Sequence, residues 1–246
     1  MKYGFLIPVY NHGKSCLEEV QILLKHNIPI ILIDDASDEE NKEWLKKCCE
    51  LSHLVDLVTN KKNLGKGGAV INGIKRAHEV GLDYVLQIDA DGQHDINRVE
   101  YFLDLSKENP DHAIIGYPIF DESVPLSRQN GRRVANNYVH FTTWNKKSIV
   151  DSMCGFRVYP VEKTYKVVKH GHWDSRMGFD IEILVRMYWA RIPMINEAVK
   201  VTYPEGSSSN FHMFRDNARI SFVFAQLTIG MLFHIPSLLK MRKLYK

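Results

Sequence analysis

The sequence predicts an α/β fold in which a mostly parallel central sheet is flanked by helices. Short apolar runs, typical of strands buried on both faces, alternate in the first half of the chain with longer segments of helical period. Strands that alternate with helices of this length form right-handed βαβ units and a parallel sheet. Three predicted strands end in polar loops, and such sheets bind their ligands at the carboxyl ends of the strands.

The first half contains five predicted strands and four predicted helices, taken here in chain order. The strands are expected at residues 5–11 (running into a loop), 28–33, 54–59, 84–88 and 113–117. The helices are expected at residues 15–26, 38–51, 69–80 and 95–107. Residues 60–68 are expected to form a polar loop, and Gly81 occupies a position that helix ends favour.

The composition is that of an ordinary globular protein. The 246 residues are 45% hydrophobic and 25% charged, which is enough for a sizeable core. A net charge of +3 gives no argument for nucleic-acid binding, although the basic residues become denser at the C-terminus, which suits an anionic membrane surface. The four cysteines fit no metal-ligand spacing and are expected as reduced thiols. No signal peptide is expected, so the N-terminal region is predicted to be cytosolic.

The predicted strand at 84–88 ends in a burst of carboxylates, Asp-Ala-Asp-Gly-Gln-His-Asp at 89–95. If the carboxylates of Asp89 and Asp91 converge, they offer two hard oxygen donors for Mg²⁺ or Mn²⁺, with a substrate diphosphate supplying much of the remaining shell. The alternative is a solvated acidic turn before the helix that starts near Asp95. No G-x-G-x-x-G follows the first strand, and the glycine loop at 65–68 lacks the spacing of a P-loop.

Four motifs occur in an order that is specific in combination. They are Pro-Val-Tyr-Asn at 8–11, Ile-Asp-Asp-Ala-Ser at 33–37, Asn-Leu-Gly-Lys-Gly-Gly-Ala at 63–69, and Asp-Ala-Asp-Gly-Gln at 89–93. In this order and spacing the first half of the chain resembles glycosyltransferase family 2. It is most similar to the branch that contains dolichyl-phosphate mannose synthase and related polyprenyl-phosphate glycosyltransferases.

The resemblance implies a GT-A fold, a nucleotide-sugar-binding α/β sandwich with a mixed central sheet. It implies that Pro8, Val9 and Tyr10 line the nucleotide pocket, that Asp35 accepts a hydrogen bond from the base, and that Asp34 fixes its loop. The alternatives are that Tyr10 merely covers a loop and that the aspartate pair caps the helix starting near residue 38.

The glycine loop and the acidic motif supply the charges of the implied site. Lys66 stands beside two glycines, which let the backbone approach an anion while the lysine provides a point charge. The resemblance implies that Asp89 and Asp91 bind the metal, with Gln93 as a further polar contact. The metal would neutralise the leaving nucleoside diphosphate.

The second half is less regular. Arg128, Arg132 and Arg133 open a predicted helix from residue 127 to 145, and they could bind a phosphate, because Arg matches phosphate geometry well. A solvated basic helix start is the alternative. Residues 151–159 resemble the family segment that closes the acceptor side, which makes Arg157 a second anion-binding and catalytic candidate.

A carboxylate at the start of the helix at 178–186 is the general base in many family members. Asp180 occupies the matching position and Glu182 comes next, but the usual Glu-Asp pair is replaced by Phe179-Asp180. A phosphate acceptor is already ionised and needs no base, in which case these carboxylates orient other groups or cap the helix. The resemblance implies that the polar loop at 203–212 closes over the diphosphate and excludes water.

Residues 220–239 contain no Asp, Glu, Lys or Arg, which makes them formally a candidate for a membrane span. Pro236 and several polar residues argue for helices that lie in the membrane interface, with the basic tail on the headgroups. A buried core helix or a dimer contact is the alternative. The expected organisation is a catalytic domain at 1–213, with a nucleotide half at 1–117 and an acceptor half at 118–213, followed by membrane-interface helices at 214–246.

These inferences predict an inverting, metal-dependent transferase. It would move one sugar from a UDP- or GDP-sugar to a lipid-linked acceptor at the cytosolic face of the membrane. One alternative keeps the fold but uses a soluble hydroxyl acceptor, with Asp180 as the base. Another is a non-catalytic subunit that binds a nucleotide sugar at the membrane. A sugar nucleotidyltransferase is disfavoured because the first strand is not followed by a glycine-rich basic loop.

Overall fold

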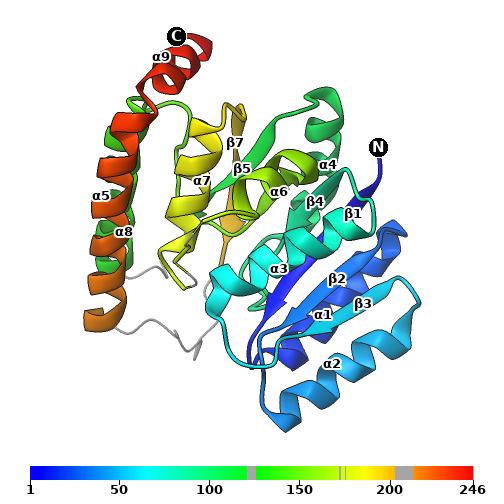
Figure 1. Cartoon of the computed structure of the whole chain (residues 1–246). Coiled ribbons are helices and arrows are strands. Elements are labelled where there is room, and N and C mark those ends of the chain that lie inside the picture. Colours follow the sequence, from blue (N-terminus) through cyan, green and yellow to red (C-terminus); the bar gives the residue numbers. More distant parts are fainter. Residues whose placement is uncertain (121–125, 172, 175, 203–212, 246) are drawn as a thin grey trace.

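A seven-stranded sheet forms the centre of the protein (Figure 1). The computed structural model describes residues 1–120, 126–171, 173–174, 176–202 and 213–245, without the side chains of 126–128 and 213–216. The strand order is β3-β2-β1-β4-β6-β5-β7. The strands are β1 (Tyr3–Val9), β2 (Ile30–Asp34), β3 (Val55–Thr59), β4 (Tyr84–Gln87), β5 (Ala113–Phe120), β6 (Arg157–Pro160) and β7 (Met194–Val201).

The predicted mostly parallel sheet is confirmed, with one antiparallel strand inside it. Strands β3, β2, β1 and β4 are parallel neighbours, and β5 pairs in parallel with β7. Strand β6 runs antiparallel to both β4 and β5 and joins the two parallel parts. The sequence did not predict β6, because its four residues begin with Arg157 and end with Pro160 and so lack the continuous apolar run of a buried strand.

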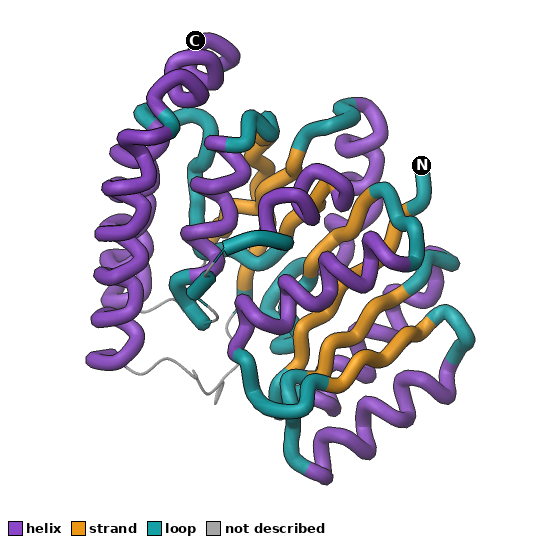
Figure 2. Tube along the Cα trace, in the orientation of Figure 1, coloured by secondary structure: helices purple, strands orange, loops and turns teal. Residues whose placement is uncertain are grey.

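Helices cover both faces of the sheet (Figure 2). They are α1 (Gly13–Leu23), α2 (Glu39–Leu51), α3 (Gly65–Glu79), α4 (Val99–Glu108), α5 (Leu126–Thr143), α6 (Val161–Val168), α7 (Phe179–Trp189), α8 (Met213–Phe233) and α9 (Ile235–Leu244). One buried core packs α1, α2 and α4 against the sheet. The other core contains α3, α6 and α7, and continues into α5, α8 and α9. Helices α5 and α8 lie side by side beyond α7, and α9 follows at the end of α8 (Figure 1).

The start of α3 corrects the predicted loop at 60–68. The helix begins at Gly65, four residues earlier than expected, because the Asp35 carboxylate accepts hydrogen bonds from the backbone N–H groups of Leu64 (2.8 Å) and Gly65 (2.7 Å). A glycine-rich run has low helix propensity, so its sequence alone indicates a loop. The helix start is fixed by a carboxylate that lies thirty residues earlier in the chain.

The C-terminal helices are amphipathic. Val223, Leu227 and Met231 of α8 are buried in the core, whereas Phe222 and Ile229 are more than 60% exposed. Among the described residues no single helix has the length and apolar character to cross a bilayer. The segments Asn217–Phe233 and Ile235–Leu244 meet that requirement only as a pair, and they are bent by 88°.

Candidate active site

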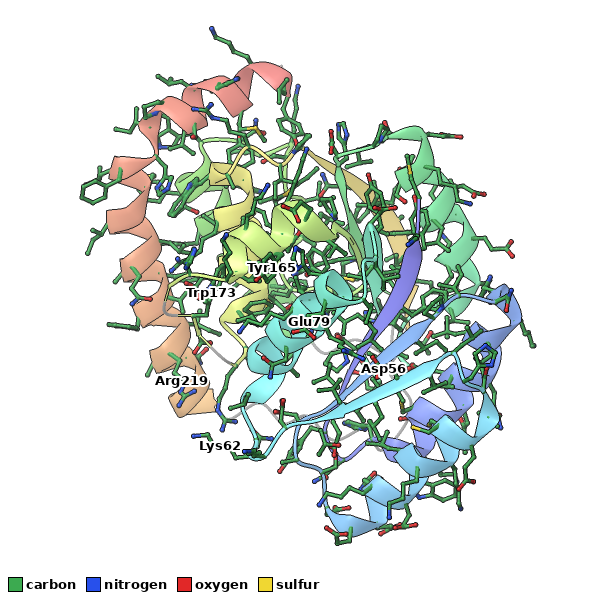
Figure 3. All side chains as sticks on the ribbon, turned by 45° about the vertical axis from the view of Figure 1, so that its right-hand side comes forward. Asp56, Lys62, Glu79, Tyr165, Trp173 and Arg219 are labelled. Atoms are coloured by element: carbon green, nitrogen blue, oxygen red, sulfur yellow. The ribbon has the colours of Figure 1, made fainter. Side chains whose placement is uncertain are left out.

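The loops after β1, β2 and β4 meet at one edge of the sheet and enclose a cleft of about 640 Å³. Its walls bring together many of the predicted site residues, namely Pro8, Val9, Tyr10, Asp35, Lys66, Asp89, Asp91, Gln93, Arg132 and Asp180. Residues without a predicted role also line it, among them His12, Asn63, His94, Cys154, Gly155 and Arg176. Figure 3 shows Lys62 and Arg219 at the same end of the molecule, where β3 leads into α3 and α8 begins.

Lys66 joins the two halves of the cleft. Its Nζ donates to Asp89 Oδ2 at 2.8 Å and lies 2.9 Å from Asp180 Oδ2. Burial disfavours the charged amine, but the two carboxylates outweigh this effect and raise the pKa of Lys66. Burial also opposes the ionisation of Asp89, yet Lys66 and then His94 lower the pKa of Asp89 to about 2. The charged amino group of Lys66 therefore lies between the two carboxylates in the cleft.

A second path of buried side chains connects the same two carboxylates. Arg157 Nη1 lies 3.4 Å from Asp180 Oδ1 and donates to the hydroxyl of Tyr159 at 3.3 Å. That hydroxyl donates to Gln87 Oε1 at 3.2 Å, and Gln87 Nε2 donates to Asp89 Oδ1 at 3.1 Å. Together with the lysine contacts, this path closes a ring of six side chains that fixes the spacing of the two carboxylates.

Hydrogen bonds with α1 and with the residue after β7 hold the loop that carries Asp91. Gln93 N–H donates to Asp91 Oδ1 at 3.1 Å, and Gln93 C=O accepts from Thr202 N–H at 3.0 Å. Glu19 of α1 accepts from the Gly92 N–H at 3.0 Å. Burial, followed by the nearby charge of Asp91, raises the pKa of Glu19 to about 8. The loop therefore rests on a buried carboxyl group that is protonated at neutral pH.

The Asp89 carboxylate also packs against backbone that has no side chain. A β-carbon built on Gly155 would lie 2.1 Å from Asp89 Oδ2 and 2.4 Å from Oδ1. Gly155 is held in place by its own segment, because Asp151 Oδ1 accepts from the backbone N–H groups of Met153 (3.0 Å) and Cys154 (2.7 Å). Only glycine fits at this position while the aspartate keeps its orientation.

The chain matches one known protein family over most of its length. The model of glycosyl transferase family 2 matches residues 5–166, which is well over half of the chain. The chain belongs to glycosyl transferase family 2. This confirms the predicted family and the predicted enzyme class, a glycosyltransferase.

Curated relatives in this family carry the names of dolichyl-phosphate glycosyltransferases, as the motifs predicted. The dolichyl-phosphate beta-glucosyltransferase of Dictyostelium discoideum is 32% identical over 88% of this chain and 73% of that protein. The UDP-N-acetylglucosamine–dolichyl-phosphate N-acetylglucosaminyltransferase of Methanococcus voltae is 31% identical over 63% of this chain and 67% of that protein. The human dolichyl-phosphate beta-glucosyltransferase is 30% identical, and the match covers 72% of this chain but 57% of the human protein.

Solved structures confirm the predicted GT-A fold. TarS from S. aureus in complex with UDP-GlcNAc has a TM-score of 0.64 at 15% identity, over 98% of this chain and 71% of that chain. Mannosyl-3-phosphoglycerate synthase from Rubrobacter xylanophilus has a TM-score of 0.63 at 14% identity, over 92% and 72% of the two chains. At these identities the likeness concerns the fold alone.

Two side chains with predicted roles in this family 2 protein are buried in the core. Arg157 is fully buried and contacts Asp180, Tyr159 and the Ser152 carbonyl, and its predicted anion contact stays a prediction. Glu182 is also fully buried, 2.5 Å from Arg186 Nη2. Residue type alone did not reveal that both side chains face the core.

The capping alternative for the aspartate pair at 34–35 is wrong. Asp38 caps α2, because its side chain accepts from the Asn41 N–H at 2.9 Å. Asp34 instead accepts from the Ser37 N–H at 2.9 Å and holds the loop, as predicted. Asp35 is buried and anchors α3, while it also lines the cleft. Its predicted contact with the base stays a prediction.

The predicted arginines are separated by the fold. Arg132 lines the cleft and donates to Asp151 Oδ1 at 2.6 Å, whereas Arg133 is exposed outside the cleft wall. The Arg128 side chain and the predicted closing loop at 203–212 lie outside the described residues. Arg176 lines the cleft without an ion-pair partner among the described residues, and its place just before the α7 helix was the only sequence signal for it.

Proposed function

We propose that this protein transfers one sugar from a UDP- or GDP-sugar to a polyprenyl-phosphate lipid, with inversion at the anomeric carbon and with a divalent metal ion. The observation that carries the proposal is the Lys66 ammonium held between Asp89 and Asp180 in the cleft, with Asp91 two residues after Asp89 on the same loop. The names of the relatives from Dictyostelium and Methanococcus support the lipid acceptor.

The two carboxylates of the Asp-Ala-Asp motif fit a hard divalent cation. Asp89 is ionised at neutral pH and Asp91 lines the same cleft. Among the described residues no three His, Cys, Asp or Glu side chains gather as a preformed metal site. Mg²⁺ and Mn²⁺ sites of this kind use one or two carboxylates and complete their shell with substrate phosphates. When bound, such an ion neutralises the departing diphosphate. A mannosyltransferase of the same fold was solved with GDP-Man and Mn²⁺.

A phosphate acceptor agrees with the charges on the other wall. Arg132 and Arg176 line the cleft and are the proposed contacts for the acceptor phosphate. An ionised phosphate oxygen attacks the anomeric carbon without a general base. The proposed role of Asp180 is therefore to hold Lys66 in position, since both of its carboxylate oxygens already face cations.

We also propose that residues 214–246 dock on the cytoplasmic face of the membrane. Four apolar side chains of α8 are at least 60% exposed on one helical stripe, namely Phe222, Ile229, Leu232 and Phe233. Exposed basic residues follow on α9. An apolar stripe with a basic end favours insertion at an anionic interface.

The decisive experiment is a transfer assay with a panel of UDP- and GDP-sugars and Mn²⁺, with and without a membrane lipid extract. We expect label to enter the lipid fraction and EDTA to abolish its transfer. Transfer to water-soluble acceptors alone would overturn the lipid acceptor and return Asp180 to the role of base. Nucleotide binding without turnover under every condition would favour a non-catalytic subunit.

A further inference from the structure

A second cavity, of about 460 Å³, lies at the opposite end of α7 from the cleft. The cleft is lined by Asp180 in the first turn of α7, whereas this cavity is lined by the last turn of that helix, by α6 and by the α8–α9 bend. Its lining residues are Lys163, Lys166, Val167, Arg186, Trp189, Ala190, Arg191, Ile192 and His234. No acidic side chain is among these described lining residues, and four cations line the walls beside an indole ring. One of the four, Arg186, is paired with the buried Glu182 at 2.5 Å.

Two of the four cations can turn toward an anion at little cost. Lys163 pairs with Asp111 at 2.9 Å and Lys166 pairs with Glu162 at 2.8 Å, and the side chains of both pairs are at least 38% exposed. Exposed ion pairs contribute little to stability. The amino groups can therefore exchange these carboxylates for an anion in the cavity.

Arg191 stands in a backbone position that normally belongs to glycine. Its N–H donates to the Tyr188 carbonyl at 2.9 Å and the Ile192 N–H donates to the Met187 carbonyl at 3.0 Å, which is a Schellman end for α7. Arg191 has a φ of 63°, the left-handed conformation that costs a residue with a β-carbon free energy. Arg191 therefore keeps its side chain at the cavity wall despite this backbone cost.

The charge of Arg191 is held at the cavity without a carboxylate partner among the described residues. Its Nε donates to Ser237 Oγ of α9 at 3.2 Å. One wall beside it is the Trp189 ring, stacked on His234 at 4.5 Å. The contact with α9 fixes the guanidinium where α7 ends and α9 begins, and guanidinium groups match phosphate oxygens in geometry.

Exposed apolar side chains stand directly next to this basic cavity. Leu232 and Phe233, 60% and 80% exposed, immediately precede the lining residue His234. We propose that the cavity binds a phosphate group carried by a membrane lipid, with the acyl chains along these two side chains. Inorganic phosphate shares the phosphate group of the lipid but has no acyl chains that could contact Leu232 and Phe233. This site is separate from the cleft and does not depend on the proposed sugar transfer.

The test is Arg191→Gly, a variant that removes the guanidinium and relieves the backbone. Binding is measured by calorimetry with monomeric dihexanoylphosphatidylglycerol, with dihexanoylphosphatidylcholine and with inorganic phosphate. We expect the anionic lipid to bind best and Arg191→Gly to weaken it about five-fold, as for one cation near anionic lipid. The melting temperature should hold or rise, because glycine is favoured at a left-handed helix end. Arg191→Lys should retain most of the binding.

Two control variants separate charge from backbone. Asn27→Gly makes the same backbone change at another left-handed residue (φ 54°). Lys25→Ala, two residues before Asn27, removes an exposed cation that does not line the cavity. Neither should change lipid binding. Equal affinity of Arg191→Gly and the parent protein would overturn the site. Inorganic phosphate that binds as tightly as the lipid would overturn the lipid as the source of the phosphate.

Discussion

Gly155 lies directly against the carboxylate of Asp89. A β-carbon at position 155 would sit 2.1 Å from one carboxylate oxygen, a distance that no real contact allows. The two residues come from different halves of the chain, and the contact joins the segment before β6 to the end of β4. The orientation of Asp89 thus depends on residue 155 being a glycine.

Gly155→Ala is expected to move Asp89 and lower turnover at least about 100-fold, because a misplacement of about 1 Å at a reacting site has effects of that size. Steady-state sugar transfer measures the loss, and Mn²⁺ binding in the presence of nucleotide shows whether the ligand was moved. The matched control is Gly131→Ala in α5, where an added β-carbon meets nothing within 4 Å. Near-normal transfer by Gly155→Ala would refute the required orientation of Asp89.

Asp91→Ala is expected to lower the transfer rate at least about 100-fold while the protein stays folded. The variant loses a proposed ligand of the metal ion that neutralises the departing diphosphate. Thermal melting and transfer are measured on the same preparation. Unchanged activity would contradict the metal assignment.

Tyr159→Phe tests the buried path between the two carboxylates. The change removes the hydroxyl that accepts from Arg157 and donates to Gln87, which leaves buried polar groups unpaired at a cost of about 1–3 kcal/mol. We expect both lower stability and lower turnover. Tyr3→Phe, which loses the hydrogen bond from Ser106 far from the cleft, should lower stability alone. Normal turnover in Tyr159→Phe would show that the path does not position the site.

The raised pKa of Glu19 makes the stability of the folded protein fall as the pH rises, which is the opposite of the effect of a carboxylate with a lowered pKa. The folded protein holds the Glu19 proton up to a pKa of about 8, whereas the unfolded chain releases it near 4.5. Between these values folding takes up a proton, so stability falls as the pH rises, by on the order of a few kcal/mol in total. Glu19→Gln should remove that slope in metal-free urea titrations and should be the more stable variant at pH 8. A parallel pH profile for the two proteins would contradict the raised pKa.

The exposed stripe of α8 predicts how the protein meets a bilayer. Ile229→Glu is expected to weaken co-sedimentation with anionic vesicles about tenfold or more, since burying an Ile side chain contributes roughly 1.5–3 kcal/mol. Ile22→Glu is the matched control, because Ile22 is 40% exposed on α1, away from the stripe. Equal losses in the two variants would refute α8 as the docking helix.

Much of the fold could be predicted from the sequence because its signals are local. The apolar runs of β1, β2 and β4 and the periodic helices α2 and α4 carry their own patterns. Strand β6 and the first turn of α3 could not be predicted this way. The strand begins with an arginine and ends with a proline, which interrupts any apolar run, and the helix start depends on Asp35, a residue from another loop.

The sequence by itself determined the family, the α/β class and which residue types meet at the carboxyl edge of the sheet, because motif order and hydrophobic period are written along the chain. Only the tertiary structure decided what each charge faces. Arg157 and Glu182 looked like ligands in the sequence, but they turn into the core, whereas Arg176 turns into the cleft. Burial and pairing depend on residues that are far apart in the chain, so the sequence pattern contains no local record of them.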